Sequence, residues 1–302
     1  MSNFSDISNH LADLVASAAP SIVRISRGRV PASGVVWRDL GDTRVVVTVS
    51  RHFRGDEGFN VLLEDGTEHP AEVIGRDPTT DLLALKTVAP GAAAKTSHGD
   101  GLRVGELAVT VGRPGRTARA TLGMISALGD AWHTPRGGLV DRWIEVDAAL
   151  PGGFGGGALL SATGAVLGVN THRLTRGGAT LPSATVDRVV DTLLKDGAIR
   201  NGYLGVGVQP AATPAEHARD GGLLVTSLEA GAPGTTAGLL VGDLLLAVDG
   251  RSVAHFRELI AALAGRVGET VDVEILRGGK DEKVQVTVGE RPERSRCGGR
   301  RR

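Results

Sequence analysis

The stretch Asp147-Ala-Ala-Leu-Pro-Gly-Gly-Phe-Gly-Gly-Gly-Ala-Leu-Leu160 decides the fold of this chain. Glycines allow a loop to turn sharply and to bring bare backbone amides close to a ligand. A phosphate-binding loop fits poorly, because no Lys-Ser/Thr pair follows and the next segment is typical of a strand rather than a helix. The glycine run is therefore either a flexible turn between two strands or a loop that aims N–H groups at developing negative charge.

The composition indicates a globular protein with room for two or three domains in 302 residues. Lys+Arg and Asp+Glu both total 34, so the net charge does not point to nucleic acid or membrane. Glycine, at 44 residues, is about twice its usual share of ~7% and favours short strands with tight turns. One Cys and eight His without metal-ligand spacing predict no disulfide framework, no metal and no cofactor.

Short β-branched runs separated by turn residues follow an N-terminal amphipathic helix that we place within residues 1–20. One set of runs spans about 21–90, with Asp65-Gly66 as a hairpin turn, and a second spans about 103–182. Successive short strands with little helix between them predict two closed β-barrels. The pattern also predicts a helix over 183–197, capped by Ser183 and ended by Gly197, which completes a region of residues 21–198.

The character of the sequence changes after residue 198. Strand patterns alternate with two helix signals over 199–290, which predicts a small α/β domain. One helix signal is the capping box Thr213-Pro-Ala-Glu216, and the other is the apolar periodicity that begins at Phe256. Residues 291–302 are rich in Arg and Gly, so we expect a disordered basic tail.

The glycine-rich loop resembles the active-site loop of the HtrA/DegP branch of trypsin-like serine proteases. The family pattern reads roughly Asp-Ala-Ala-Ile-Asn-Pro-Gly-Asn-Ser-Gly-Gly-Pro-Leu. Aligned without gaps, Gly155 falls where the family has its nucleophilic serine, and Gly153 falls two residues before it. The resemblance implies an oxyanion hole made by the N–H groups of Gly153 and Gly155. Ala158 and Pro151-Gly152 also depart from the family pattern.

Two further segments carry the same resemblance. His52, in Val47-Thr-Val-Ser-Arg-His52, takes the place of the family's general base at the end of a strand. Asp81, in Asp77-Pro-Thr-Thr-Asp-Leu-Leu-Ala-Leu-Lys86, takes the place of the carboxylate that orients the imidazole. The chain order His52, Asp81, Gly155 fits the family. A surface histidine at a strand end and an aspartate that caps a turn are the structural alternatives.

The span after Asn201 resembles a PDZ domain of the HtrA kind. The segment 232–250 matches its Ala-Gly-Leu and Gly-Asp pattern, and Gly-Tyr-Leu-Gly-Val over 202–206 looks like its carboxylate-binding loop. The resemblance therefore implies a mainly β protein: a chymotrypsin/trypsin-like double β-barrel followed by a small α/β PDZ domain.

The resemblance also implies where peptides bind. Ala149 stands where the trypsin fold sets the floor of the substrate pocket, which suits small or medium apolar side chains. The strand around Val169, Asn170 and Thr171 would pair with an extended peptide by strand addition. The PDZ site would comprise Tyr203 and the amides of Leu204, Gly205 and Val206, with Phe256 and Leu259 on the opposite wall of the groove.

We expect a protease homologue that binds polypeptide segments or C-termini without cutting them, because the nucleophile is missing. Removing the nucleophile lowers kcat by roughly 10⁶ in a comparable triad enzyme. The alternative is an active HtrA-type serine endopeptidase in protein quality control that uses another nucleophile. A single changed residue in an ordinary enzyme is a third interpretation, although Ala158 and Pro151-Gly152 argue against it.

Expected partners are unfolded polypeptides or protein C-termini. The resemblance also suggests a homo-oligomer, a trimer, with Leu11, Leu14 and Val15 as its contacts, or an assembly with an active relative. Neither a membrane span nor a signal peptide is evident, which predicts a cytoplasmic protein. A periplasmic or extracytoplasmic location is the alternative if the N-terminus is trimmed or misassigned.

Overall fold

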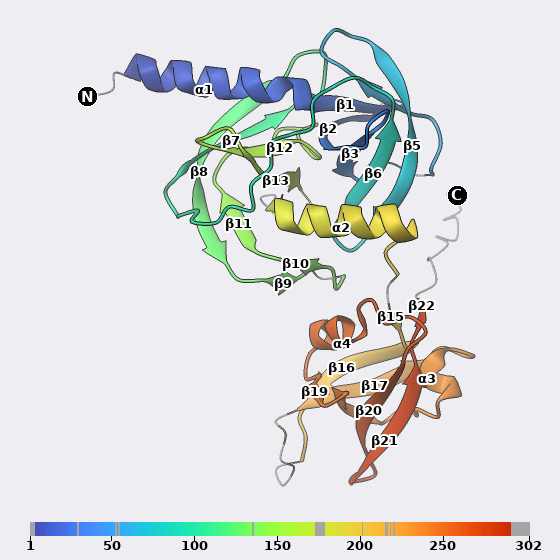
Figure 1. Cartoon of the computed structure of the whole chain (residues 1–302). Helices are drawn as coiled ribbons and strands as arrows, with labels where there is room; N and C mark the ends of the chain where they lie inside the picture. The colour runs from blue at the N-terminus through green and yellow to red at the C-terminus, as the bar shows by residue number, and fades with distance from the viewer. Residues whose placement is uncertain are drawn as a thin grey trace, which may run out of the picture. The chain divides into compact units, whose positions relative to one another are not determined.

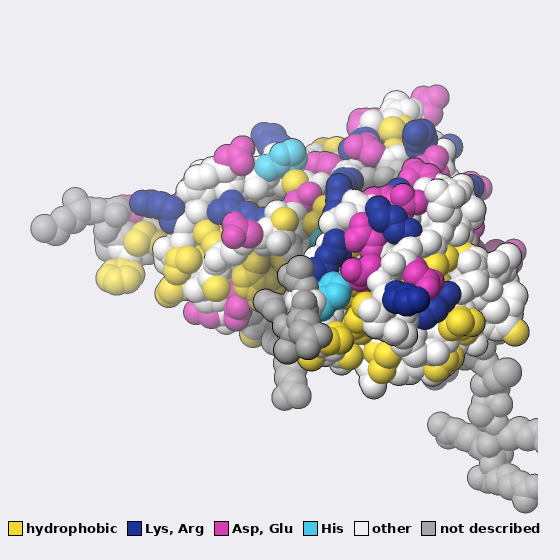
Figure 2. Space-filling model, turned by 90° about the horizontal axis from the view of Figure 1, so that it is seen from below, with side chains coloured by type: hydrophobic (Ala, Val, Ile, Leu, Met, Phe, Trp, Pro, Cys, Tyr) yellow, Lys and Arg dark blue, Asp and Glu magenta, His cyan; other side chains and the backbone are white. Residues whose placement is uncertain are grey.

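The computed structural model divides the chain into two compact units, residues 1–199 and residues 200–302 (Figure 1). The structure describes residues 4–28, 30–51, 53, 55–134, 136–172, 179–200, 202–214, 217, 219 and 221–290. The predicted base His52 and the predicted tail 291–302 lie outside these residues. Lys/Arg and Asp/Glu side chains are intermingled on the face in Figure 2, in keeping with 34 residues of each charge.

The first half of unit 1 is a closed antiparallel barrel in the order β1-β2-β3-β6-β5-β4. Successive residues of β3 are buried in two different hydrophobic cores. Val46 packs inside the barrel, whereas Val45 and Val47 pack against the second half of the unit. This explains why the strand is apolar without alternation. The strands are β1 (Ile22–Arg27), β2 (Val30–Asp39), β3 (Arg44–Val49), β4 (Phe59–Leu62), β5 (Glu68–Asp77) and β6 (Leu82–Thr87).

The second half of unit 1 is a six-stranded sheet in the order β11-β8-β7-β12-β13-β14, whose end strands β11 and β14 approach each other. The predicted strands are present, and β9, β10 and β14 are additional. The strands are β7 (Leu107–Gly112), β8 (Arg119–Gly129), β9 (Trp132–His133), β10 (Leu139–Val140), β11 (Trp143–Val146), β12 (Ala158–Ser161), β13 (Val166–Thr171) and β14 (Ala179–Pro182). The mainly β, barrel-based fold is confirmed.

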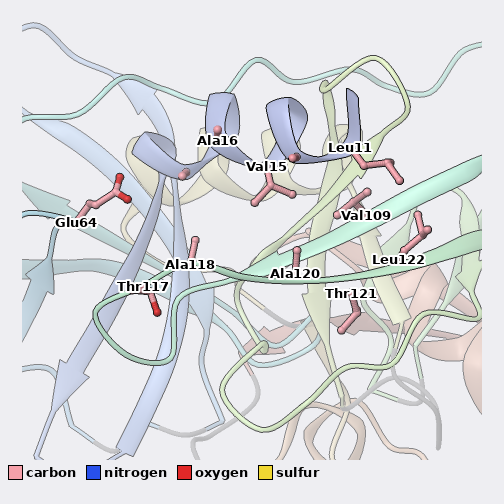
Figure 3. Close-up of a pocket in the computed structure, with 12 residues that line it drawn as sticks. Leu11, Val15, Ala16, Glu64, Val109, Thr117, Ala118, Ala120, Thr121 and Leu122 are labelled. Atoms are coloured by element: carbon pink, nitrogen blue, oxygen red, sulfur yellow. The ribbon is translucent and has the colours of Figure 1, made fainter. Parts of the chain in front are cut away.

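Helix α1 (Phe4–Ala18), continued by the 3-10 turn η1 (Ala19–Ser21), packs on unit 1. Leu11 and Val15 point toward β7 and β8 and line a pocket of about 550 Å³ (Figure 3). Leu14 is buried against its own chain, so the prediction that it contacts another subunit is wrong for this residue. The fully buried guanidinium of Arg113 fixes the start of β1 by donating to the carbonyls of Ala19 and Ile22, 3.0 and 2.6 Å away.

Helix α2 (Ser183–Asp196) packs against both halves of unit 1, where Val186, Val189 and Leu193 join the shared core (Figure 1). Gly197 ends the helix with φ 72°, as predicted. The prediction that Ser183 caps the helix is wrong. Ser183 is already the first helical residue. Its hydroxyl donates to the carbonyl of Ser97 at 2.6 Å, a contact with a distant segment that takes the place of a capping bond to the first turn of the helix.

Unit 2 contains a six-stranded antiparallel sheet in the order β16-β17-β18-β20-β21, with β19 paired to β18 and α4 against the sheet. The predicted helix start at Thr213 is wrong for the described residues, since Thr213 and Pro214 are not helical and the Thr213 hydroxyl bonds to the Arg219 carbonyl. The elements are β15 (Gly202–Tyr203), β16 (Val206–Ala211), β17 (Gly222–Leu228), α3 (Pro233–Thr236), β18 (Leu244–Val248), β19 (Arg251–Ser252), α4 (Phe256–Leu263), β20 (Thr270–Arg277), β21 (Lys280–Thr287) and β22 (Gly289–Glu290).

The buried carboxylate of Asp243 forms an ion pair within unit 2. The Asp243 side chain is 2% exposed and accepts two bonds from the Arg277 guanidinium, at 2.7 and 2.8 Å, and one from the Leu240 N–H at 2.8 Å. Burial raises the pKa of Asp243, but the bonds from Arg277 and Leu240 and the charge of Arg277 outweigh it, so the pKa lies below its usual 3.8. The ion pair therefore stabilises unit 2 at pH values above the pKa of Asp243 in the unfolded chain. This stability is lost as the pH falls through the lower pKa that Asp243 has in the folded chain.

We expect Arg277→Met to destabilise unit 2 by about 3 kcal/mol at pH 7, because it leaves a buried charge without its partner. At pH 3 the penalty should shrink, because Asp243 can then take up a proton. Urea denaturation at both pH values measures the difference. Arg266→Met, which frees the more exposed Asp249 and Glu269, is the matched control and should cost below about 1 kcal/mol. Equal penalties at the two pH values would contradict the assignment.

Candidate functional site

The glycine-rich loop is built so that three of its glycines cannot carry a side chain. A Cβ on Gly156 would lie 2.1 Å from the Ser33 carbonyl oxygen, and one on Gly157 would lie 2.2 Å from that of Val111. Gly153 has φ 88°, and its Cβ would lie 2.5 Å from Pro114 Cβ. These glycines are required because backbone and ring atoms approach the chain closely.

Gly155 differs from those three glycines. Its φ is not in the left-handed region, and a Cβ would meet Val49 Cγ2 at 3.3 Å and His172 Nδ1 at 3.4 Å. Both distances require at most a small adjustment of flexible side-chain atoms. Residue 155, where the resemblance places the nucleophile, is thus a position that can hold a side chain, although this sequence supplies none.

Ser33, in β2 of the closed barrel, holds the loop through two groups. Its N–H donates to the Gly155 carbonyl at 3.1 Å, and its hydroxyl donates to the Gly153 carbonyl at 2.6 Å. Its carbonyl accepts the Thr48 hydroxyl at 2.6 Å, and its hydroxyl also accepts the Arg113 N–H at 2.8 Å. The sequence analysis missed Ser33, which carries no motif and lies 120 positions from the loop.

Some backbone N–H groups of the loop donate hydrogen bonds within the chain, and others have no acceptor among the described residues. The N–H groups of Phe154 and Gly156 donate to the carbonyls of Pro151 and Asn170, at 3.1 and 2.8 Å. Those of Gly153 and Gly155 donate to no acceptor within the described part of the chain. Two such N–H groups on one rigid loop are the donors that an oxyanion hole requires.

Asp81 directly precedes β6 and is bonded to β13 and to the residues that follow β3. It is fully buried with φ 69°, and its Oδ2 accepts the Thr171 hydroxyl at 3.0 Å. Its other oxygens accept backbone N–H groups, Oδ1 from Arg51 at 3.0 Å and the carbonyl from Ser50 at 2.7 Å. Asp81 is therefore bonded to Ser50 and Arg51, the two residues that precede His52 in the sequence.

The turn that presents Asp81 is preorganised by Asp77. The Asp77 carboxylate is buried and accepts the hydroxyls of Thr79 and Thr80, at 2.5 and 2.6 Å, together with the Thr79 N–H at 2.9 Å. Asp side chains favour turns through such local bonds. The motif Asp-Pro-Thr-Thr-Asp therefore specifies a rigid turn that holds Asp81 in place.

Two predictions concern peptide binding at the barrel. Ala149 is exposed, and its carbonyl accepts the Thr121 hydroxyl of β8 at 2.7 Å, while its place in a substrate pocket stays a prediction. Val169, Asn170 and Thr171 are fully buried and paired with β14 on one side, while Asn170 also bonds the loop on the other. Val169 and Asn170 are therefore paired at both edges, whereas the strand partner described for Thr171 lies at the β14 edge, so the pairing of a peptide with Thr171 stays a prediction.

His172 follows that strand and was missed. Its Nε2 lies 2.8 Å from the Leu150 carbonyl, and its Nδ1 faces Gly155. The sequence offered one signal for His172, its position directly after residues 169–171, which were predicted to pair with a substrate. No motif identifies His172 itself as a functional residue.

The loop 203–206 of unit 2 leaves backbone amides available. Gly205 has φ 73°, and a Cβ there would lie 2.1 Å from Ala232 Cβ, so only glycine fits. The carbonyls of Leu204 and Gly205 accept the N–H groups of Gly234 and Glu229, at 2.7 and 2.9 Å. The N–H groups of Leu204 and Gly205 donate to no acceptor among the described residues.

An edge strand directly follows this loop in unit 2. Strand β16 is at the edge of its sheet, with α4 nearby, and Val206 and Val208 are partly exposed on it. Phe256, at the start of α4, is exposed. The prediction that Leu259 forms the wall is wrong, because this residue is buried in the core of the unit. Tyr203 lies in β15, outside the main sheet.

Comparison with known proteins agrees with the geometry of both units. A family model described as a trypsin-like peptidase domain matches residues 32–169, and one described as a PDZ domain matches residues 202–288. A probable periplasmic serine endoprotease, DegP-like, of Rhizobium meliloti (strain 1021) is 34% identical over 280 residues, which cover 88% of this chain and 54% of that protein. The chain belongs to the HtrA/DegP family. Its similarity to that relative extends through both matched domains.

Further HtrA/DegP relatives give the same picture. The DegP-like protein of Chlamydia trachomatis serovar D is 35% identical over 82% of this chain and 52% of its own. Among solved structures, the HtrA-type protease AlgW with a decapeptide has a TM-score of 0.76 at 26% identity and covers 93% of this chain and 99% of that one. The serine endoprotease from Yersinia pestis gives 0.76 at 27%, covering 93% and 98%. The chain spans about half the length of the curated relatives it matches.

The relatives overturn one expectation from the sequence. The curated relatives are named periplasmic, so the prediction of a cytoplasmic protein is wrong. Among the described residues, no helix has the length and apolar character needed to cross a membrane.

Proposed function

We propose that this HtrA/DegP homologue binds polypeptides and protein C-termini without cutting them. The observation that carries the proposal is Gly155, which can accommodate a Cβ beside two unused amides but provides no hydroxyl. Acyl transfer requires a nucleophile next to a base, and an oxyanion hole without a nucleophile retains only ~10³–10⁴ of the rate enhancement over water. Position 155 is accordingly assigned to the missing nucleophile, with Asp81 and His52 as its former partners.

Five other hydroxyl groups in the described part of the chain are already engaged. Those of Ser33, Thr48 and Thr171 each donate to an oxygen between 2.6 and 3.0 Å away. Ser50 accepts from the Arg76 guanidinium at 3.3 Å, and Ser161 pairs with Thr163 at 2.8 Å. A hydroxyl that is committed to a structural bond is a poor substitute for the serine, which supports an inactive site.

The alternative is an active serine endopeptidase. It is favoured by the names of the curated relatives, which are serine endoproteases, and by the buried Asp81 bonded beside His52. It requires a nucleophile other than residue 155.

Unit 2 supports the binding half of the proposal. The amides of Leu204 and Gly205 suit a terminal carboxylate, and the free edge of β16 suits the backbone of the preceding residues. Partly exposed Val206 and Val208, with Phe256 across from them on α4, favour an apolar C-terminus. Assembly as a homo-oligomer or with an active relative stays a prediction.

We expect a labelled peptide with an apolar free C-terminus to bind at least about tenfold more tightly than its C-terminal amide, because charge-assisted bonds to the carboxylate are lost in the amide. Fluorescence anisotropy measures the binding, and mass spectrometry of the same mixtures after prolonged incubation should find the peptide intact. Equal binding of acid and amide would contradict the PDZ assignment. Cleavage that His52→Ala abolishes would establish the alternative instead.

A further inference from the structure

A pocket of about 550 Å³ lies between α1 and the sheet in the second half of unit 1 (Figure 3). All twelve residues that line this α1 pocket belong to the described part of the chain. Five of them are alanines, which are Ala12, Ala16, Ala19, Ala118 and Ala120. Because alanine side chains are short, the helix and the sheet leave an apolar space between them here. Its volume lies within the range of ~300–1,000 Å³ that is usual for small-molecule sites.

The walls of the α1 pocket offer few hydrogen-bonding groups to a ligand. One wall is a helix, in which backbone groups bond to one another, and the floor is the face of a sheet, which presents side chains rather than backbone groups. The Thr121 hydroxyl already donates to the Ala149 carbonyl at 2.7 Å. An extended polypeptide would therefore bury its own N–H and C=O groups without partners, at a cost in free energy. An alkyl chain has no such groups, so the pocket favours an alkyl chain over a polypeptide.

Glu64 gives the α1 pocket one charged end. It is the charged residue among the twelve, and it lies at the opposite end from Leu11 and Leu122 (Figure 3). Its Oε2 lies 3.6 Å from the Arg113 guanidinium, which is fully buried and already donates to three backbone carbonyls. The Glu64 side chain is itself 62% exposed, so its carboxylate can also accept bonds from a ligand. A carboxylate at the end of an apolar pocket attracts a cation and repels an anion.

The arginines next to the floor of the pocket do not reverse this preference. Ala120 and Leu122 point toward α1, whereas Thr121 points away from it (Figure 3). Because side chains alternate along a strand, Arg119 is directed to the same side as Thr121, away from the pocket. Arg116 precedes the floor and is not one of the twelve lining residues. Helix α1 itself contains two aspartates and no Lys or Arg.

We propose that the α1 pocket binds a linear alkyl chain that carries a terminal ammonium group. In this complex the chain lies along the alanines, and the ammonium group donates to the Glu64 carboxylate. None of the twelve lining residues belongs to the loop 147–157 or to unit 2, so the inference is independent of the proposed function.

The test is isothermal titration calorimetry of the full chain at pH 7 with octylammonium chloride, below the concentrations at which this compound forms micelles. Each buried methylene contributes about fourfold to affinity. Butylammonium, which lacks four methylenes, should therefore bind at least about tenfold more weakly. Octanol retains the chain without the charge and should bind about threefold more weakly than octylammonium, as expected for a partly exposed ion pair.

Variants of the lining residues locate the site. Glu64→Gln should weaken the binding of octylammonium about threefold and leave that of octanol unchanged. Ala120→Leu fills the pocket and should weaken the binding of both compounds at least about tenfold, and Ala16→Leu should do the same with a residue that favours helices. Ala92→Leu changes an exposed residue that does not line the pocket, so this matched control should bind as the native protein does. Thermal unfolding verifies that each variant is folded.

Equal affinity of the native protein for octylammonium and octanol would overturn the proposal, and so would unchanged affinity in both folded filling variants. The absence of octylammonium binding by the native protein would also overturn it. If Ala120→Leu then changed the molar mass in light scattering, the pocket would be assigned to a second copy of this chain instead. None of these results concerns peptide cleavage or the binding of peptide C-termini, by which the proposed function is tested.

Discussion

A Gly155→Ser variant is expected to hydrolyse casein that the native protein leaves intact. The new Cβ would meet Val49 and His172 at 3.3 and 3.4 Å, distances that need only small side-chain shifts. Since loss of the nucleophile lowers kcat by roughly 10⁶ in a comparable triad enzyme, the gain can reach that order if residue 155 meets His52 correctly. Mass spectrometry of the digest measures the products and locates the cut bonds.

Two controls make this prediction specific. Gly155→Ala adds the same Cβ without a hydroxyl and should stay inert, and Gly155→Ser/His52→Ala should lose the new activity. Adding His172→Ala to Gly155→Ser should raise the rate further, by about tenfold, because Nδ1 of His172 otherwise competes for the serine hydroxyl. Hydrolysis by the native protein at the rate of Gly155→Ser, or inactivity of a folded Gly155→Ser, would refute the assignment of position 155.

The strands of this protein were predictable because their signals are local. β3 is a run of β-branched residues, and the Asp65-Gly66 turn sets the β4–β5 pairing in which Leu62 lies opposite Glu68. The helix that ends at Gly197 was predictable because its apolar residues recur at helical spacing and a glycine, which adopts the left-handed conformation, follows its last turn. The family patterns around Asp81 and Gly205 added the fold class, which the structure and the comparisons confirm.

The contacts that hold the site were not predictable in this way. Ser33 is bonded to Gly153 across 120 positions, and His172 reaches back 22 positions to Leu150. Such contacts depend on which strands converge, and no local pattern encodes them. The same reason explains the errors at Ser183 and Leu259, where packing against distant segments decided the outcome.

The strand Val169–Thr171 illustrates how a resemblance can mislead about function. Its residues lie where the family pattern places them, and Thr171 bonds to Asp81. Strand β14 nevertheless pairs along one edge of this strand, and on the other edge Asn170 already bonds to Gly156 and Gly157. A motif therefore locates residues in the fold, whereas the hydrogen-bond partners of each residue decide whether it is available.

Gly156→Ala is expected to destabilise unit 1 by about 3 kcal/mol or more. Gly156 has φ 85°, which disfavours any residue with a Cβ, and the new atom would lie 2.1 Å from the Ser33 carbonyl and 2.5 Å from the Thr48 hydroxyl. Neither neighbour can move freely, because Ser33 also bonds to Gly153 and Gly155. Differential scanning calorimetry of the full chain measures the loss, with the unit 2 transition as an internal reference.

The loop contains its own matched control for this prediction. A Cβ on Gly152 would meet nothing within 4 Å, and its φ is not left-handed, so Gly152→Ala should change stability by less than about 0.5 kcal/mol. Gly155→Ala should lie between the two. If Gly156→Ala were as mild as Gly152→Ala, Ser33 would not be holding the loop rigid. The two amides at Gly153 and Gly155 would then lack the fixed geometry that an oxyanion hole requires.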